Sequence, residues 1–183
     1  MPRLPMIADD KMTDAQRRAV NSITSGKRGR VGGPFPALLR SPTLCERTAS
    51  LGEFLRFETS LPPRLSEMAI IITAHYWRAQ YEWFAHAPLA QKGGLADDII
   101  EAIRVGKRPA KMAADEEALY NFCTELHEKK RVSDATYKKA VEVFGETAVA
   151  EIIGLSGYYV LVSMALNVSG VELPAGEKLP FPE

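Results

Sequence analysis

Residues 149–168, VAEIIGLSGYYVLVSMALNV, are almost continuously apolar and decide the fold class of this chain. A helix of this length is nearly long enough to cross a lipid bilayer. Glu151 and Asn167 argue against a membrane span, because a single spanning helix needs a lipid-facing surface on every side. Gly154 and Gly157 are small enough to let a neighbouring backbone come close. We therefore expect a helix buried inside the protein and no membrane partner.

Elsewhere in the chain, apolar residues recur at the three- and four-residue spacing of helices that bury one face. Capping residues, prolines and glycines indicate where these helices begin and end. No run of alternating apolar residues is long enough for a sheet. The sequence thus predicts an all-α protein with about seven or eight helices. The expected segments are roughly 13–26, 42–57, 66–72, 79–92, 97–103, 114–130, 133–145 and 147–168.

Several local expectations accompany these segments. Ser66 is a good N-cap for a short central helix, which would place Glu67 in its first turn. Tyr137 is expected to face the core, and His127, among charged neighbours, to lie on the surface. In the helix after Pro42 the residues expected to face inward are Leu44, Thr48, Leu51, Phe54 and Leu55.

The chain of 183 residues is most simply one domain. We expect a flexible arm over residues 1–12, a single domain over 13–170 and an extended tail over 171–183, which contains three prolines. The basic, glycine-rich loop of residues 27–36 is either a plain solvated connection or, like the tail, a segment that contacts another subunit.

The composition excludes some partners. Twenty-three basic residues balance 23 acidic ones, so no large basic field favours nucleic acid. Cys45 and Cys123 are far apart and lack companions at metal-ligand or redox spacing, and we expect both to be reduced and buried. The N-terminus carries charged residues rather than an apolar signal region. We expect a cytoplasmic protein.

The stretch His75–His86, HYWRAQYEWFAH, carries two of the three histidines and both tryptophans. If it is helical, Glu82 and His86 are one turn apart on the same face, and Glu67 lies just upstream. A carboxylate beside an imidazole can move a proton near neutral pH. A structural ion pair on a buried helix is the alternative. Tyr81 and Trp83 would form walls of the site.

A metal site is a further alternative, since two glutamates and a histidine are adequate ligands for Zn or Fe. Their spacing belongs to no standard metal-binding helix, so we expect no metal. No dinucleotide-binding or phosphate-binding motif is present, and no cofactor is expected.

The chain resembles the carboxymuconolactone decarboxylase family, whose members share the AhpD-like all-α fold. Most of the chain takes part in this resemblance. The segments that carry it are Gly33-Pro34-Phe35, Arg64-Leu-Ser-Glu67, Tyr81-Glu-Trp83, His86-Ala-Pro-Leu-Ala90, Gly94-Leu95 and Gly157-Tyr158-Tyr159. In the peroxidase branch of this family two cysteines follow the glutamate at twelve and fifteen residues, and a histidine follows at nineteen. Here those positions hold Ala79, Glu82 and His86.

The glutamate and histidine are therefore kept and both thiols are missing. A disulfide-cycling peroxidase needs thiolates, so the resemblance implies the decarboxylase-like branch, which acts on small carboxylated lactones without a thiol. Glu67, Glu82 and His86 would then be catalytic. Arg64 or Arg78 would orient the carboxylate of the substrate, and His75 would lie at the margin of the pocket.

The resemblance also implies a homo-oligomer, because family members assemble as trimers or hexamers. Two other functions remain open: another lyase or isomerase of the same fold, and a catalytically idle oligomeric protein that only binds a ligand.

Overall fold

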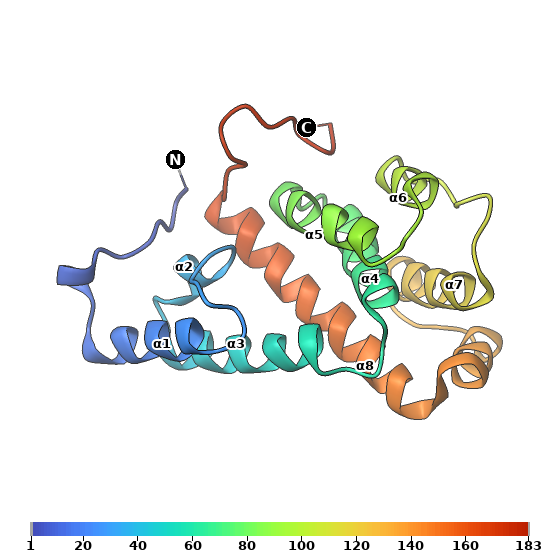
Figure 1. Cartoon of the computed structure of the whole chain (residues 1–183), viewed down its shortest axis with the longest axis horizontal. Coiled ribbons are helices and arrows are strands. Elements are labelled where there is room, and N and C mark those ends of the chain that lie inside the picture. Colours follow the sequence, from blue (N-terminus) through green and yellow to red (C-terminus); the bar gives the residue numbers. More distant parts are fainter. Residues whose placement is uncertain (1, 183) are drawn as a thin grey trace.

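The computed structural model describes residues 2–182, and every regular element among them is a helix, which confirms the predicted all-α class. The helices are arranged as two groups that meet along the last helix (Figure 1). Their bounds are η1 (Asp9–Lys11), α1 (Asp14–Ser25), α2 (Phe35–Leu38), α3 (Pro42–Phe57), α4 (Pro63–Tyr76), α5 (Gln80–Lys92), α6 (Asp97–Arg104), α7 (Ala114–Lys129) and α8 (Asp134–Ser169).

Local sequence signals explain most of these bounds. Thr13 and Gln16 form a capping box at the start of α1. Helix α4 begins earlier than predicted: Pro63 occupies its first turn, where a proline loses no helical hydrogen bond, and Ser66 lies inside the helix. Glu67 therefore lies in the second turn of α4. Helix α5 continues through Pro88 to Lys92.

The two groups of helices have separate cores. Helices α1 to α3 bury a small cluster that includes Ile23, Phe35 and Leu39. Helices α4 to α8 share a larger one, in which α4 is buried on nearly every face and packs against α5, α7 and α8. Helix α8 also contacts α2 and α3, so it joins the groups. A site built from both groups must therefore lie beside α8.

Helix α8 is interrupted at Gly145, whose backbone has the non-helical angles φ 79° and ψ 165°. The sequence predicted a helix end at this glycine, and the chain does leave the helical conformation there before resuming it. In the part of the chain that the structure describes, α8 alone is long and apolar enough to cross a membrane. Half of the residues in its most apolar 18-residue stretch are buried inside the protein.

Some expectations about burial are wrong. On α3 the large residues Leu44, Leu51 and Phe54 are exposed. The reason is that α3 turns its smaller residues toward α1 and α8. Tyr137 is exposed as well, whereas Ala140 in the same segment of α8 is buried. His127, expected at the surface, is buried, and its Nε2 lies 2.9 Å from Thr73 Oγ1.

Both ends of the chain are attached to the domain. In the arm, the Arg3 amide donates a 2.6 Å hydrogen bond to the Ser169 carbonyl. The tail, expected to lie on a neighbouring subunit, instead folds back toward α5 (Figure 1). Its Phe181 is only 1% exposed and packs edge-on against Trp83. Moving an apolar ring from water into the protein core lowers the free energy of the folded state, so the ring holds the tail against its own domain.

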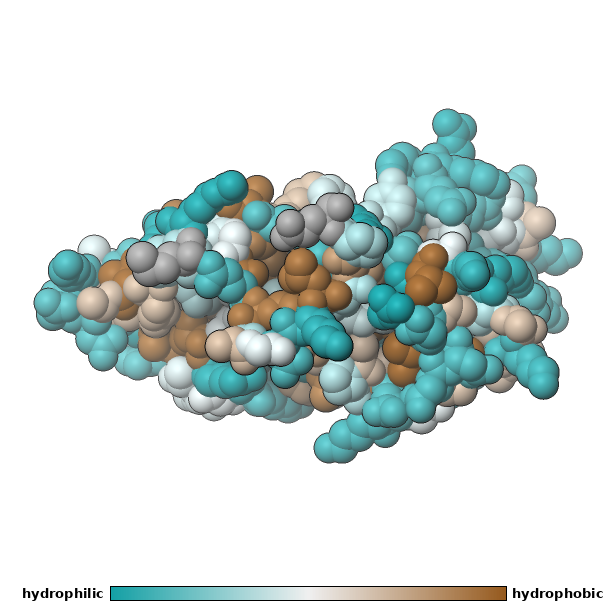
Figure 2. Space-filling view, turned by 90° about the horizontal axis from the view of Figure 1, so that it is seen from above, coloured by the Kyte–Doolittle hydropathy of each residue, from teal (hydrophilic) through white to brown (hydrophobic). Residues whose placement is uncertain are grey.

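Figure 2 shows that the two ends of the molecule differ in surface character. Hydrophobic residues gather toward the middle and left of this face, whereas the end that carries α6 and α7 is mostly hydrophilic.

Candidate functional site

Glu67, Glu82 and His86 lie together in the interior, although α4 supplies the first and α5 the other two. His86 Nδ1 lies 2.6 Å from Glu67 Oε2, and His86 Nε2 lies 3.1 Å from Glu82 Oε1. The second contact follows from the four-residue spacing along α5. The first depends on the packing of α4 against α5. The imidazole is thus held between two carboxylates.

The charge state of His86 follows from this arrangement. Burial alone lowers the pKa of a histidine, but the hydrogen bonds to Glu67 and Glu82 outweigh it and raise the pKa of His86 to about 9. The ring is therefore an imidazolium at neutral pH and can donate through both nitrogens.

The same geometry disfavours a metal at the three residues. The two nitrogens of His86 point away from each other across the ring, and each is occupied by a different carboxylate. One ion cannot bind a ring nitrogen together with both glutamates. Within residues 2–182 no group of three or more histidine, cysteine or acidic side chains is arranged to hold a metal ion.

A cavity of about 310 Å³ opens beside this triad, where the two groups of helices meet. Glu82 and His86 line it, and Glu67 does not, so Glu67 lies behind the imidazole as seen from the cavity. Tyr81 also lines the cavity, as the sequence predicted for a wall residue. Gly33 and Pro34, from the loop before α2, and Phe35, the first residue of α2, form part of the lining.

Several basic residues line the cavity, and the sequence pattern had not assigned them to the site. Lys27, Arg28, Arg30 and Arg56 are among its lining residues, against the single acidic residue Glu82; the Lys27 ammonium is paired with Glu58 at 3.0 Å. The basic composition of residues 27–33 was a visible signal for three of these. Nothing in the sequence distinguished Arg56, which reaches the cavity only because α3 packs beside α8.

Arg28 is held in place by α8 and α3. Its Nη2 donates a 3.1 Å hydrogen bond to Tyr158 Oη. A Cβ atom at Gly52 would clash with both partners of this bond, so the glycine leaves the space that the pair occupies. The Nε atoms of Arg28 and Arg56 are buried without a hydrogen-bond partner among the described residues. Unpaired buried donors are uncommon, and here they lie on two side chains that line one cavity.

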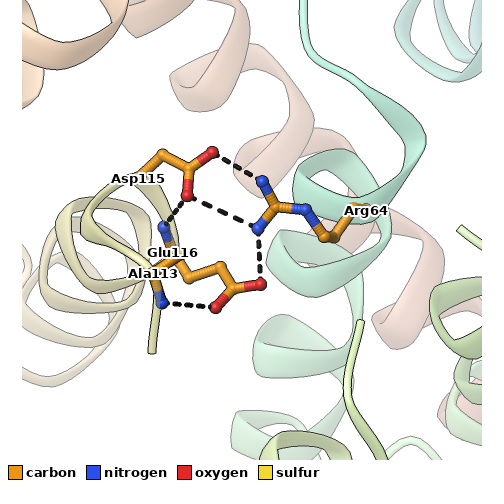
Figure 3. A network of polar contacts seen from close by, with 4 residues as sticks. All are labelled: Arg64, Ala113, Asp115 and Glu116. Atoms are coloured by element: carbon orange, nitrogen blue, oxygen red, sulfur yellow. Dashed lines mark hydrogen bonds and ion pairs between the residues drawn. The ribbon is translucent and has the colours of Figure 1, made fainter. Parts of the chain in front are cut away.

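Four residues proposed to bind substrate lie elsewhere. The guanidinium of Arg64 contacts both Asp115 and Glu116, with a distance of 2.6 Å from Nη2 to Asp115 Oδ2 (Figure 3). It joins α4 to α7 and is not free to bind a substrate carboxylate. Trp83 is buried against Phe181 and does not line the cavity. His75 and Arg78 line a second cavity that shares no residue with the first.

Comparison with known proteins agrees with the fold. No protein-family profile matches the chain, and no curated protein matches it. Among solved structures, the chain is similar to an alkylhydroperoxidase AhpD core, an uncharacterized peroxidase-related protein from Ralstonia eutropha JMP134. The TM-score is 0.77 at 17% sequence identity, over 95% of this chain and 93% of that one. The chain therefore has the AhpD-like helical fold.

Proposed function

We propose that this protein acts on a small carboxylated substrate by general acid–base chemistry at His86, Glu67 and Glu82. The observation that carries the proposal is the buried imidazolium between two carboxylates, beside a cavity whose lining includes Arg28, Arg30 and Arg56. A protonated group at neutral pH is a proton donor, and a cationic lining attracts a carboxylate. The resemblance to carboxymuconolactone decarboxylases supports a carboxylated lactone as the substrate.

The three residues would have different roles. Glu82 and His86 touch the cavity and are the catalytic pair, whereas Glu67 orients the ring through Nδ1 and favours its charged form. In a decarboxylation, the carbon–carbon bond to the carboxylate breaks and carbon dioxide leaves. The electron pair moves into the conjugated lactone as a dienolate. One carbon of the dienolate then takes a proton from the His86–Glu82 pair, which regains it from water.

Arg28 and Arg56 are the proposed carboxylate-binding residues, in place of Arg64 and Arg78. Both line the cavity, and both carry a buried Nε donor without a partner among the described residues. A guanidinium binds a carboxylate with two parallel hydrogen bonds, which fixes the orientation of the substrate.

The surroundings of the two cysteines disfavour the thiol peroxidase activity that the name of the structural neighbour suggests. Burial raises the pKa of the Cys45 thiol to about 11, with a smaller effect of the Glu46 charge, and that of Cys123 to about 12. Neither residue lines the cavity, and a thiol that stays protonated is a poor nucleophile. We expect no peroxide consumption with a dithiol donor.

The experiment is turnover of 4-carboxymuconolactone, followed by the loss of lactone absorbance. We expect His86→Ala and Glu82→Gln to lower kcat at least a hundredfold, the usual effect of removing a general acid. Glu142→Gln, on the exposed surface of α8, is the matched control and should keep the wild-type rate. Undiminished turnover in folded His86→Ala protein would overturn the proposal.

The other two functions give different results in the same experiment. Turnover of a different carboxylated lactone or keto acid, with the same dependence on His86, would indicate another lyase or isomerase. Binding of the lactone without turnover, lost on Arg28→Ala and Arg56→Ala substitution, would indicate an idle binding protein.

We also propose that the protein is a homo-oligomer, a trimer or hexamer as in the family it resembles. Supporting this, Ile153, Leu161, Met164 and Val168 are exposed at helical spacing along α8. A row of exposed apolar residues on one helix is more typical of an interface than of a free surface. Light scattering at micromolar concentration tests the proposal, and a monomer would contradict it.

A further inference from the structure

The second cavity shares no lining residue with the cavity beside the acid–base site and belongs to no function described above. Its volume is about 250 Å³, and it is enclosed by the end of α4, the loop after α6 and one face of α7. Its floor is apolar, formed by Ile72 and Ile103, which are nearly fully buried. A space of this size suits a ligand with about one ring.

The walls of this cavity are flat rings. Tyr76 and His127 are stacked, with ring centroids 5.1 Å apart and an interplanar angle of 23°. His75 and Tyr120 supply two further rings from α4 and α7. Aromatic side chains bind another ring by offset stacking or edge contacts, which an aliphatic ligand of the same size cannot fully replace.

Each histidine has one ring nitrogen without a protein partner among the residues that the structure describes. Both nitrogens are acceptors, so neither binds a carboxylate, whose place must be at the cations of the rim. The Thr73 hydroxyl donates to the Ala69 carbonyl and so must accept from His127 Nε2, which leaves His127 Nδ1 as an acceptor. No hydrogen bond to that Nδ1 is present among residues 2–182. His75 Nδ1 is buried and also lacks a partner in the described chain. Burial lowers the pKa of both histidines, with smaller effects of Arg78 on His75 and Lys130 on His127, so both rings are neutral.

Unusual backbone conformations concentrate around the same cavity. Arg78 and Lys130 are the only described residues other than glycine with positive φ, at 51° and 62°. Arg78 lines the cavity, and the Lys130 ammonium lies 4.4 Å from the Tyr76 ring centroid. Gly106 has φ 70°, and a Cβ atom there would lie 3.2 Å from His75 Nε2. Lys130 is the left-handed C-cap of α7, an ordinary helix ending, and a glycine adopts positive φ without strain, so Arg78 is the strained residue that lines the cavity.

The charges at the rim favour an anion. Arg78 and Lys107 line the cavity, Lys130 lies beside it, and Glu128 is the only carboxylate in its lining. The Lys107 ammonium forms no ion pair within the described part of the chain. Arg78 is partly engaged, since its Nη2 donates to the Pro182 carbonyl. Lys107 is therefore the free cation at this rim.

We propose that this cavity is a binding site for a monocyclic aromatic carboxylate, with the ring against Tyr76 and His127 and the carboxylate at Lys107. The site is independent of the acid–base triad, because the two cavities share no lining residue. Benzoate is the simplest probe of this chemistry. A ligand of so few atoms binds with a Kd on the order of 1 mM.

The test is a titration of the full-length protein with benzoate, followed by amide chemical shifts in ¹H–¹⁵N spectra. We expect shifts at Gly106, Lys107 and Thr124. Lys107→Ala should weaken binding about tenfold, the loss of one charge-assisted hydrogen bond. Tyr76→Leu should weaken it severalfold through the lost stacking.

Two controls keep the proposal falsifiable. Lys111→Ala removes an exposed lysine of the same loop that does not line the cavity, and it should leave these shifts and their midpoint unchanged. Cyclohexanecarboxylate has the same charge without a flat ring and should bind more weakly than benzoate. The proposal would be overturned by chemical shift changes confined to the first cavity, or by equal affinity for the two acids. It would also be overturned if no shift changes at a benzoate concentration about ten times the expected Kd.

Discussion

Substituting Glu67 by Gln tests the charge state of the candidate site most directly. The substitution keeps the shape of the side chain and removes the negative charge that lies 2.6 Å from His86 Nδ1. Glu67 does not line the cavity, so the change acts on a ligand or substrate only through the imidazole. We expect the pKa of His86 to fall.

The magnitude follows from the surroundings of His86. The pKa of about 9 lies about 2.5 pH units above the ordinary value of 6.5, although burial opposes the rise. The two carboxylates together therefore contribute more than this difference. If they contribute equally, loss of one lowers the pKa of His86 by more than about one pH unit, to below about 8.

The assay is the pH dependence of the imidazole signals in ¹H–¹⁵N spectra of protein labelled at histidine. The signal of His86 is assigned by its absence in His86→Gln. Glu142→Gln removes an exposed carboxylate from α8 and serves as the control, with an unchanged midpoint. A wild-type midpoint below 6.5, or the same midpoint in wild type and Glu67→Gln, would refute the proposed electrostatics of the site.

The same pKa predicts how stability depends on pH. Since the folded protein holds the proton of His86 more tightly than the unfolded chain does, this stabilisation is complete below pH 6.5 and is lost as the pH rises through 9. Over that range the free energy of unfolding should fall by roughly 3 kcal/mol from this group alone. Urea denaturation of wild type and Glu67→Gln measures it, and the variant should show a smaller fall. An equal fall in both proteins would contradict the assignment to His86.

Three further predictions concern the rest of the molecule. Arg64→Ala leaves a buried carboxylate unpaired and should lower the free energy of unfolding by about 3 kcal/mol in urea denaturation; a loss below about 0.5 kcal/mol would contradict the structural role. Phe181→Ala should cost about 3 kcal/mol, whereas Leu179→Ala, at an exposed position of the tail, should cost little; equal effects would show that the tail is not anchored by the ring. Cys45 and Cys123 should resist a thiol reagent in the native protein and react after unfolding, which a colorimetric thiol assay measures; rapid native reaction would contradict their burial.

Helix positions were largely predictable because they depend on neighbours in sequence. The capping box of α1, Pro42 at the start of α3 and Gly93 at the end of α5 are local signals, and the helices begin or end there. The predicted start of α4 is wrong because Ser66 is an equally good local signal for the start of a helix. The helix begins three residues earlier, at Pro63. Which face of a helix is buried was less predictable, as the exposed Leu51 shows, since it depends on where other helices pack.

For the candidate site, the sequence by itself determined the pair Glu82 and His86, because a four-residue spacing places two side chains on one helix face whatever surrounds them. Only the tertiary structure decided that Glu67 reaches the other ring nitrogen, that Arg64 is engaged by α7, and that Arg56 lines the cavity. These contacts join residues far apart in the chain. Their geometry depends on how whole helices pack, and no local pattern of residue types encodes it.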